Sequence, residues 1–114
     1  MRLRLAYPLL AATVLLPAAG HRTAAQDVNT AMLRRGETLL TTNCAPCHAV
    51  GRTGGSPRQD APTFRSLSKK YPIETLAESL AEGLFTGHPD MPEFTFKAPD
   101  VGAIIAYLES IQER

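Results

Sequence analysis

Both cysteines of this 114-residue chain and one of its three histidines lie within the five residues CAPCH, at positions 44–48. Cys44 and Cys47 are three residues apart, so on a helical turn both sulfur atoms project from one face, and His48 projects beside them. This arrangement suits a planar ligand that is attached at two points along one edge and carries a metal ion at its centre. The motif therefore predicts a domain built around a bound cofactor.

The pattern C-x-x-C-H is the attachment signature of c-type haem, in which both thiols add to the vinyl groups and the imidazole binds the iron. A disulfide, a thioredoxin-like redox site and a zinc site are the alternatives. A thioredoxin-like site follows a strand, whereas a helical pattern leads into Cys44. A structural zinc site would need a second closely spaced pair of ligands. We therefore predict one covalently attached haem c, held by Cys44, Cys47 and His48.

The first 25 residues have the pattern of an export signal. Two arginines precede an uncharged apolar run at residues 5–16, and small residues follow it. The run is shorter than the roughly 20 apolar residues that a spanning helix needs, so we favour a signal peptide over an uncleaved membrane anchor. We expect cleavage after Ala25 rather than after Gly20, which leaves residues 26–114 as one periplasmic domain.

The charge of that domain argues against binding to nucleic acid. The whole chain has 12 basic and 11 acidic side chains, and loss of the signal removes three arginines and no acid, which leaves a net charge of −2. Charge is also uneven along the chain, with a net charge of +4 over residues 51–70 and −6 over residues 71–114. We expect the basic stretch to steer an acidic partner. Two solvated faces are the alternative.

The fold is predicted to be all-α, with three main helices and short turns, because no segment alternates like a strand. The first helix begins after an N-cap at Asn29 and runs into the cysteine motif. A short helical turn follows Pro62, the second helix begins at Pro72, and the third begins near Pro99. The two loops between them, residues 49–62 and 86–98, are irregular, and a long irregular loop in a small domain usually wraps around something.

From Leu33 to Gln112 the sequence resembles the small single-haem class I cytochromes c. The resemblance depends on Gly36, on the segments APTF and DMPEF, and on the aromatic-aliphatic pair Tyr107 and Leu108 in the last helix. In that family a glycine at the position of Gly36 lets the first helix cross the last one closely. The resemblance implies a cytochrome c-like fold wrapped around covalently bound haem.

The resemblance also implies two further site residues. Pro62 matches the proline whose carbonyl accepts a hydrogen bond from the outer nitrogen of the ligating histidine, and ligating histidines generally have such an acceptor. Met91 matches the methionine that supplies the sixth iron ligand. The prolines of HPDMP predict a stiff segment around it. His88 and an open or water-bound site are the alternatives for the sixth position.

Four aromatic side chains are candidates for the walls of the haem pocket, with ordinary core positions as the alternative. They are Phe64, Phe85, Phe94 and Phe96.

Iron held by His48 and Met91 has both axial positions filled, so its remaining chemistry is the gain and loss of one electron. We expect a periplasmic electron carrier, not an enzyme, that cycles Fe(III)/Fe(II) between a donor dehydrogenase or respiratory complex and an acceptor. The expected partners are these redox proteins, with no nucleic acid and no stable membrane insertion. The chain is expected to be a monomer. The alternatives are a haem c subunit of a periplasmic dehydrogenase complex and a haem peroxidase or gas-binding protein.

Overall fold

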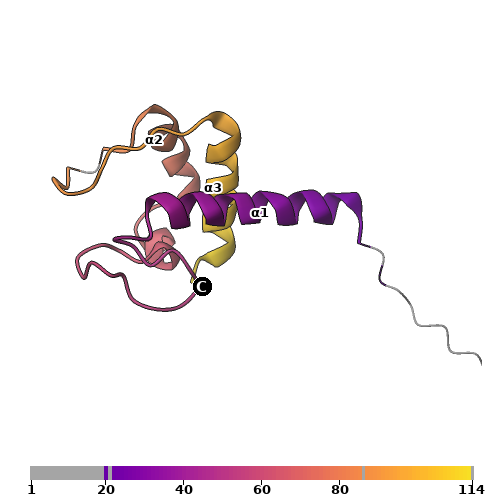
Figure 1. Cartoon of the computed structure of the whole chain (residues 1–114), viewed down its shortest axis with the longest axis horizontal. Coiled ribbons are helices and arrows are strands. Elements are labelled where there is room, and N and C mark those ends of the chain that lie inside the picture. The colour runs from indigo at the N-terminus through magenta and orange to yellow at the C-terminus, as the bar shows by residue number, and fades with distance from the viewer. Residues whose placement is uncertain (1–19, 21, 86, 114) are drawn as a thin grey trace, which may run out of the picture.

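The computed structural model describes residue 20, residues 22–85 and residues 87–113, and these contain helices and no strand. The elements in chain order are α1 (Ala24–Asn43), η1 (Phe64–Lys69), η2 (Ile73–Thr75), α2 (Leu76–Glu82) and α3 (Ala98–Ile111). The long helix α1 crosses α3, and the two loops lie at the same end of the molecule as the C-terminus of α1 (Figure 1). The predicted all-α architecture is therefore confirmed.

The predicted export signal falls mainly outside the described residues. Within the part of the chain that the structure describes, no helix combines the length and the apolar character needed to cross a membrane.

Helix α1 begins earlier than the sequence pattern indicated, so the predicted N-cap at Asn29 is wrong. The N-cap is Thr23, whose hydroxyl accepts a hydrogen bond from the Gln26 amide at 3.3 Å, while the Gln26 side chain accepts one from the Thr23 amide at 2.8 Å. This reciprocal pair is a capping box. The turns from Ala24 to Met32 are exposed to solvent and extend beyond the rest of the molecule (Figure 1).

The crossing of α1 over α3 depends on Gly36, which is buried against the other helix. A Cβ atom at this position would lie 2.7 Å from the carbonyl carbon of Ala103 and 2.8 Å from the Cβ of Tyr107, and closer still to the Ala103 carbonyl oxygen. These distances are too short for any side chain. The packing reason predicted for this glycine is confirmed.

The core is centred on α3, which is buried on more than one side because it lies between α1 and the shorter elements. Its buried aliphatic side chains are Val101, Ile104, Leu108 and Ile111, and Ile105 packs against the core while partly exposed. Ala103 and Tyr107 are buried as well, on the side facing α1. The other elements contribute Leu40, Phe64, Leu67, Ile73 and Leu80.

The C-terminal end of α3 holds η1 in place. The Glu113 amide donates to the Arg65 carbonyl at 2.8 Å, and the Gln112 side chain donates to the Phe64 carbonyl and accepts from the Ser68 amide, both at 2.9 Å. These bonds fix η1 against the last helix. They thereby position Phe64, which faces the cysteine motif.

Candidate haem site

The CAPCH motif continues α1 as a helical turn. Helix α1 ends at Asn43, and the amides of Cys44 and Ala45 both donate to the Leu40 carbonyl. The amides of Cys47 and His48 then donate to the Cys44 carbonyl, at 3.1 and 2.9 Å. Both thiols are free, and Cys44, Cys47 and His48 all line one cavity. The structure therefore places the three side chains together, as the spacing predicts.

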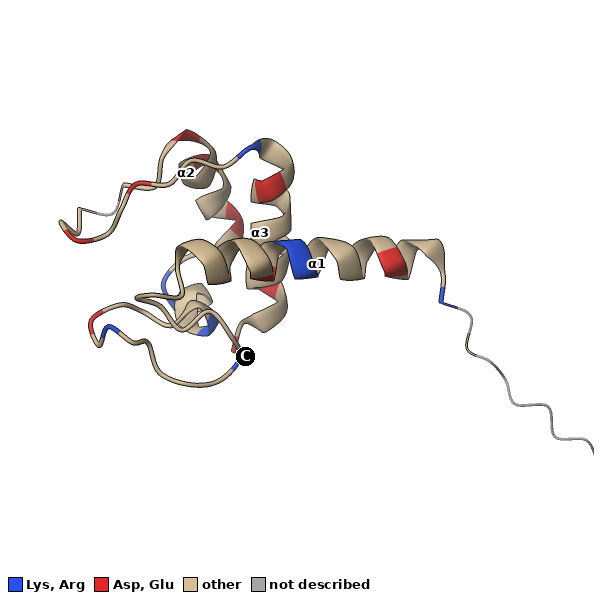
Figure 2. Ribbon diagram, in the orientation of Figure 1, with Lys and Arg blue, Asp and Glu red and all other residues tan. Residues whose placement is uncertain are grey.

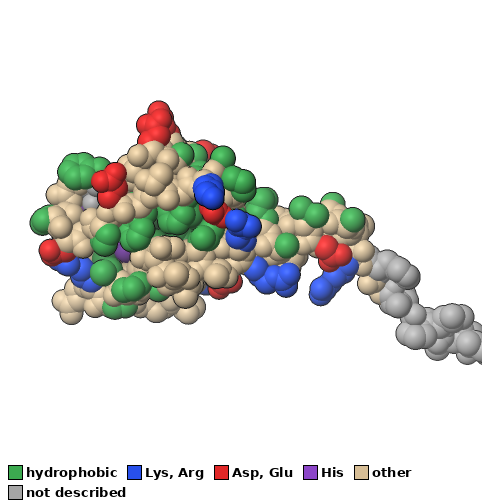
Figure 3. Space-filling model, turned by 45° about the horizontal axis from the view of Figure 1, so that its top comes forward, with side chains coloured by type: hydrophobic (Ala, Val, Ile, Leu, Met, Phe, Trp, Pro, Cys, Tyr) green, Lys and Arg blue, Asp and Glu red, His purple; other side chains and the backbone are tan. Residues whose placement is uncertain are grey.

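This cavity has a volume of about 440 Å³ and is lined mainly by apolar side chains. Figure 3 shows hydrophobic side chains gathered around a hollow on this side of the molecule. The floor is formed by residues that also belong to the core, namely Leu40, Phe64, Leu67, Leu80, Ile104 and Leu108. A flat, largely apolar ring system with a metal at its centre fits this lining.

The His48 ring is buried and held from two sides. Its Nδ1 lies 2.8 Å from the Pro62 carbonyl oxygen. Because a carbonyl only accepts, Nδ1 carries the proton and Nε2 keeps the lone pair that a metal requires. The ring also lies against Phe64, with 4.7 Å between ring centroids, and the Phe64 amide donates to the Ala49 carbonyl at 2.9 Å. The hydrogen bond expected between His48 and Pro62 is thus present.

The Cys44 thiol is not set up as a redox nucleophile. Burial, together with the nearby Cys47, raises the pKa of Cys44 to about 11. Reactive thiols of thioredoxin-like sites have a lowered pKa instead. The preceding element is also a helix rather than a strand. The thioredoxin-like alternative therefore finds no support at this site.

Met91 reaches the same cavity from the loop between α2 and α3. Its amide donates to the His88 carbonyl at 3.1 Å, which closes a tight turn through Pro89 and Asp90. The base of this loop is fixed by two backbone hydrogen bonds, from Leu84 to Phe94 and from Phe96 to Leu80. His88 also lines the cavity, but its Nε2, one of the two atoms that could bind iron, lies 3.2 Å from an Asp60 carboxylate oxygen.

The four phenylalanines differ in their surroundings. Phe64 and Phe94 line the cavity, whereas Phe96 packs against the core. Phe85 is 85% exposed and does not line the cavity, so its assignment as a pocket wall is wrong. The cause is the end of α2 at Gly83, whose φ of 127° redirects the chain just before Phe85.

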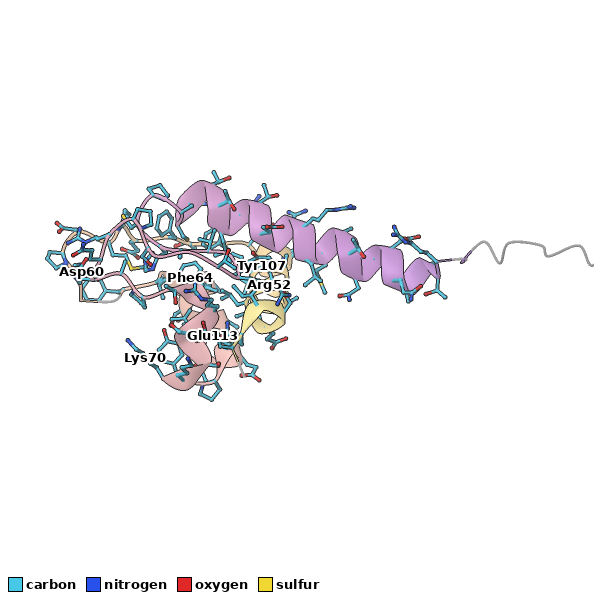
Figure 4. All side chains as sticks on the ribbon, turned by 90° about the horizontal axis from the view of Figure 1, so that it is seen from below. Arg52, Asp60, Phe64, Lys70, Tyr107 and Glu113 are labelled. Atoms are coloured by element: carbon cyan, nitrogen blue, oxygen red, sulfur yellow. The ribbon has the colours of Figure 1, made fainter. Side chains whose placement is uncertain are left out.

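Tyr107 lies beneath α1, with Arg52 close by (Figure 4). Its hydroxyl donates to the Val50 carbonyl at 3.2 Å, which ties the segment after the motif to the helix crossing. Burial and the nearby Glu37 raise its pKa. Tyr107 is therefore a core residue that also supports the haem-binding segment.

Most of the basic stretch at residues 51–70 is neutralised locally. Arg58 pairs with Asp60 and Asp90, and both Arg65 and Lys69 pair with Glu113. On the ribbon, basic and acidic positions lie close to each other in the loop that follows the motif (Figure 2). These ion pairs reduce the uncompensated positive charge of the stretch, which weakens the expectation that it steers an acidic partner.

The polar residues at the mouth of the cavity were not predicted as a group. They come from three separate segments and are Arg58, Asp60, Lys70, Tyr71, His88 and Asp90. No spacing in the sequence connects them, because two irregular loops and the short segment after η1 bring them together.

Two comparisons with known proteins identify relatives of this chain, and one of them spans both the CAPCH motif and Met91. A family model described as cytochrome c oxidase, cbb3-type, subunit III matches residues 31–108. A cytochrome c-552 from Bradyrhizobium diazoefficiens is 32% identical over 77 residues, which are 68% of this chain and 72% of that relative. No solved structure matches the chain. The chain therefore belongs to the cytochrome c family as a small single-haem class I member, with one covalent haem c and a role in electron transport.

Proposed function

We propose that the chain is a periplasmic one-electron carrier in which Cys44 and Cys47 would hold the haem covalently and His48 and Met91 would bind its iron. The observation that carries this proposal is the shared cavity, which the CAPCH motif lines from the end of α1 and Met91 lines from a separate loop. When bound, haem supplies a reversible change between Fe(III) and Fe(II).

The chain's own residues control that change. The Pro62 carbonyl fixes the ring orientation and the tautomer of His48, which leaves Nε2 available to the metal. The apolar lining excludes water, and the thioether of Met91 favours Fe(II), so both raise the potential. With His48 and Met91 both bound to it, the metal would have no free position for a substrate. A carrier of electrons is the function that remains.

A haem c subunit of a larger redox complex is the second candidate, and one finding favours it. The matching family model is described as a subunit of a cbb3-type oxidase. Isolation of the protein from membranes and from the periplasm separates the two candidates. A free carrier is recovered as a haem-containing monomer, whereas an obligate subunit is recovered together with its partners.

The sixth ligand is tested by replacing Met91 with alanine. The oxidised wild type is expected to show the weak near-red absorption of a sulfur–iron(III) bond. Met91→Ala should lose this band, lower the potential and bind imidazole, because the thioether is gone. Met32→Ala is the matched control, since Met32 lies on the exposed part of α1 and does not line the cavity. Loss of the low-spin state in His88→Ala, with the band retained in Met91→Ala, would show that the assignment is wrong.

Covalent attachment and export are tested in the same expression system. Cys44→Ala and Cys47→Ala should each sharply reduce haem-stained protein in the periplasm. N-terminal sequencing of the mature protein identifies the cleavage site. Cleavage after Ala25 would remove Thr23 and its capping box, whereas cleavage after Gly20 would keep both. A full-length N-terminus on a membrane-bound protein would refute the cleaved signal peptide and support the uncleaved membrane anchor.

A further inference from the structure

Two loops form opposite walls of the haem cavity, and side chains link them. We call residues 49–63 the first loop and residues 83–97 the second loop. Arg58 of the first loop contacts Asp90 of the second, with 2.8 Å between Nη2 and Oδ2. Asp60 of the first loop contacts His88 of the second, with 3.2 Å between Oδ2 and Nε2.

Arg58 is fixed at its backbone and aimed by its neighbour. Its amide donates to the Cys47 carbonyl at 3.2 Å, so its main chain is attached to the cysteine motif itself. Its Nε donates to Asp60 Oδ1 at 2.7 Å, and its Nη2 donates to Asp60 Oδ2 at 3.4 Å and to Asp90 Oδ2 at 2.8 Å. These hydrogen bonds raise the pKa of Arg58 and lower the pKa of Asp60. Arg58 and Asp60 therefore both stay charged at neutral pH.

Asp90 is the residue directly before Met91, and both belong to the tight turn that the Met91 amide closes. A contact that holds Asp90 therefore also limits the movement of Met91. Iron–thioether bonds are weak and hold best when the loop is preorganised, so a small change in loop position affects how often the sulfur is in place.

We propose that Arg58 is a positioning residue for Met91, because it links the CAPCH motif on one side of the cavity to the turn that carries Met91 on the other. The inference rests on the proposed role of Met91 as the sixth ligand. Arg58 acts through Asp90, and Asp60 orients its guanidinium. The cluster of Arg58, Asp60 and Asp90 is named the loop clasp.

A direct contact of Arg58 with the haem carboxylates is the competing role, because Arg58 also lines the cavity. The two roles differ in their dependence on Asp90. A residue that acts through the second loop loses its effect when Asp90 loses its charge, whereas a residue that pairs with haem does not.

The test uses haem-loaded Arg58→Gln, Asp90→Asn and the double variant. Imidazole is titrated into the oxidised protein, where it competes with Met91, and the near-red band is recorded in parallel. Each single variant is expected to bind imidazole about two- to five-fold more tightly at low salt, as the range for exposed ion pairs implies. The double variant should match the single variants, and the difference should shrink at high salt.

Arg65→Gln is the control, because Arg65 is also an ion-paired arginine but pairs with Glu113 and does not line the cavity. It should bind imidazole like the wild type. Three outcomes would overturn the proposal: wild-type affinity in Arg58→Gln, an effect of Arg58→Gln without one of Asp90→Asn, or additive effects in the double variant. If Met91→Ala itself keeps the wild-type band and affinity, the proposed ligand is wrong and the proposal fails with it. If Met91→Ala loses the near-red band but Arg58→Gln binds imidazole like the wild type, the ligand assignment stands and only the proposed role of the loop clasp is refuted.

Discussion

Replacement of Gly36 by alanine is expected to lower the free energy of unfolding by about 2 kcal/mol. The new Cβ would lie 2.7 Å from the carbonyl carbon of Ala103 and 2.8 Å from the Cβ of Tyr107. Because the Ala103 atoms belong to the backbone and cannot rotate away, α1 and α3 must move apart. Overpacking of this kind costs about 1–3 kcal/mol, and we take the upper end. The higher helix propensity of alanine returns about 1 kcal/mol of that cost.

Thermal unfolding of the haem-loaded protein, followed by far-ultraviolet circular dichroism, measures this loss. For a domain of this size the midpoint should fall by roughly 10 °C. Gly102→Ala is the matched control, because Gly102 lies in α3 and no atom would come within 4 Å of its Cβ. It should gain roughly 0.5–1 kcal/mol from helix propensity. A midpoint that rises in both variants would refute the close crossing.

Three other changes test the supports of the site. Tyr107→Phe removes the hydroxyl that donates to the segment after the motif, and is expected to cost about 0.5–1.5 kcal/mol in urea unfolding. Glu113 has its pKa lowered by hydrogen bonds from Lys69 and then Arg65. A carboxylate whose pKa is lowered by folding stabilises the fold at pH values above its pKa in the unfolded chain. Glu113→Gln should therefore be less stable than the wild type at neutral pH, and equally stable once the pH falls below the pKa of Glu113 in the folded protein. A difference in stability between the two proteins that persists below that pKa would contradict this prediction. Thr23→Ala should speed amide exchange in the first turns of α1, if they are retained, without lowering the unfolding midpoint, because these turns are exposed.

Local rules in the sequence are enough to predict the proximal side of the site. Cys44, Cys47 and His48 lie within one helical turn, so the hydrogen bonds of that turn alone place their side chains together. The three helices follow from the helical patterns, whereas the role of Gly36 at the helix crossing was implied by the family resemblance. Pro62 required more, because its hydrogen bond to His48 spans 14 residues of irregular chain and only the family resemblance indicated it.

The features that the sequence did not reveal lie where periodicity is absent. The early start of α1 was missed because its exposed turns carry no apolar stripe, although Thr23 and Gln26 have the spacing of a capping box. The contact between Arg58 and Asp90 joins two loops 32 residues apart, and no local rule fixes how such loops face each other. Phe85 was misassigned because hydrophobic character alone does not tell which way a loop residue points.

The core and the haem site of this protein share their side chains. Leu40, Leu80, Ile104 and Leu108 are buried core residues and also line the cavity. Without haem, this cavity of about 440 Å³ would leave its apolar lining in contact with water or without packing partners, and either state destabilises a small domain. Folding and haem attachment are therefore expected to be coupled.

The shared lining also predicts which substitutions change two properties at once. Leu80→Ala removes apolar volume from both the core and the cavity wall, so it should lower the free energy of unfolding by about 2–5 kcal/mol. It should also let water approach the iron and lower the redox potential, measured by spectroelectrochemical titration. Gly36 lies at the helix crossing and does not line the cavity, so Gly36→Ala should change stability alone. An unchanged potential in Leu80→Ala would show that the lining does not control the iron.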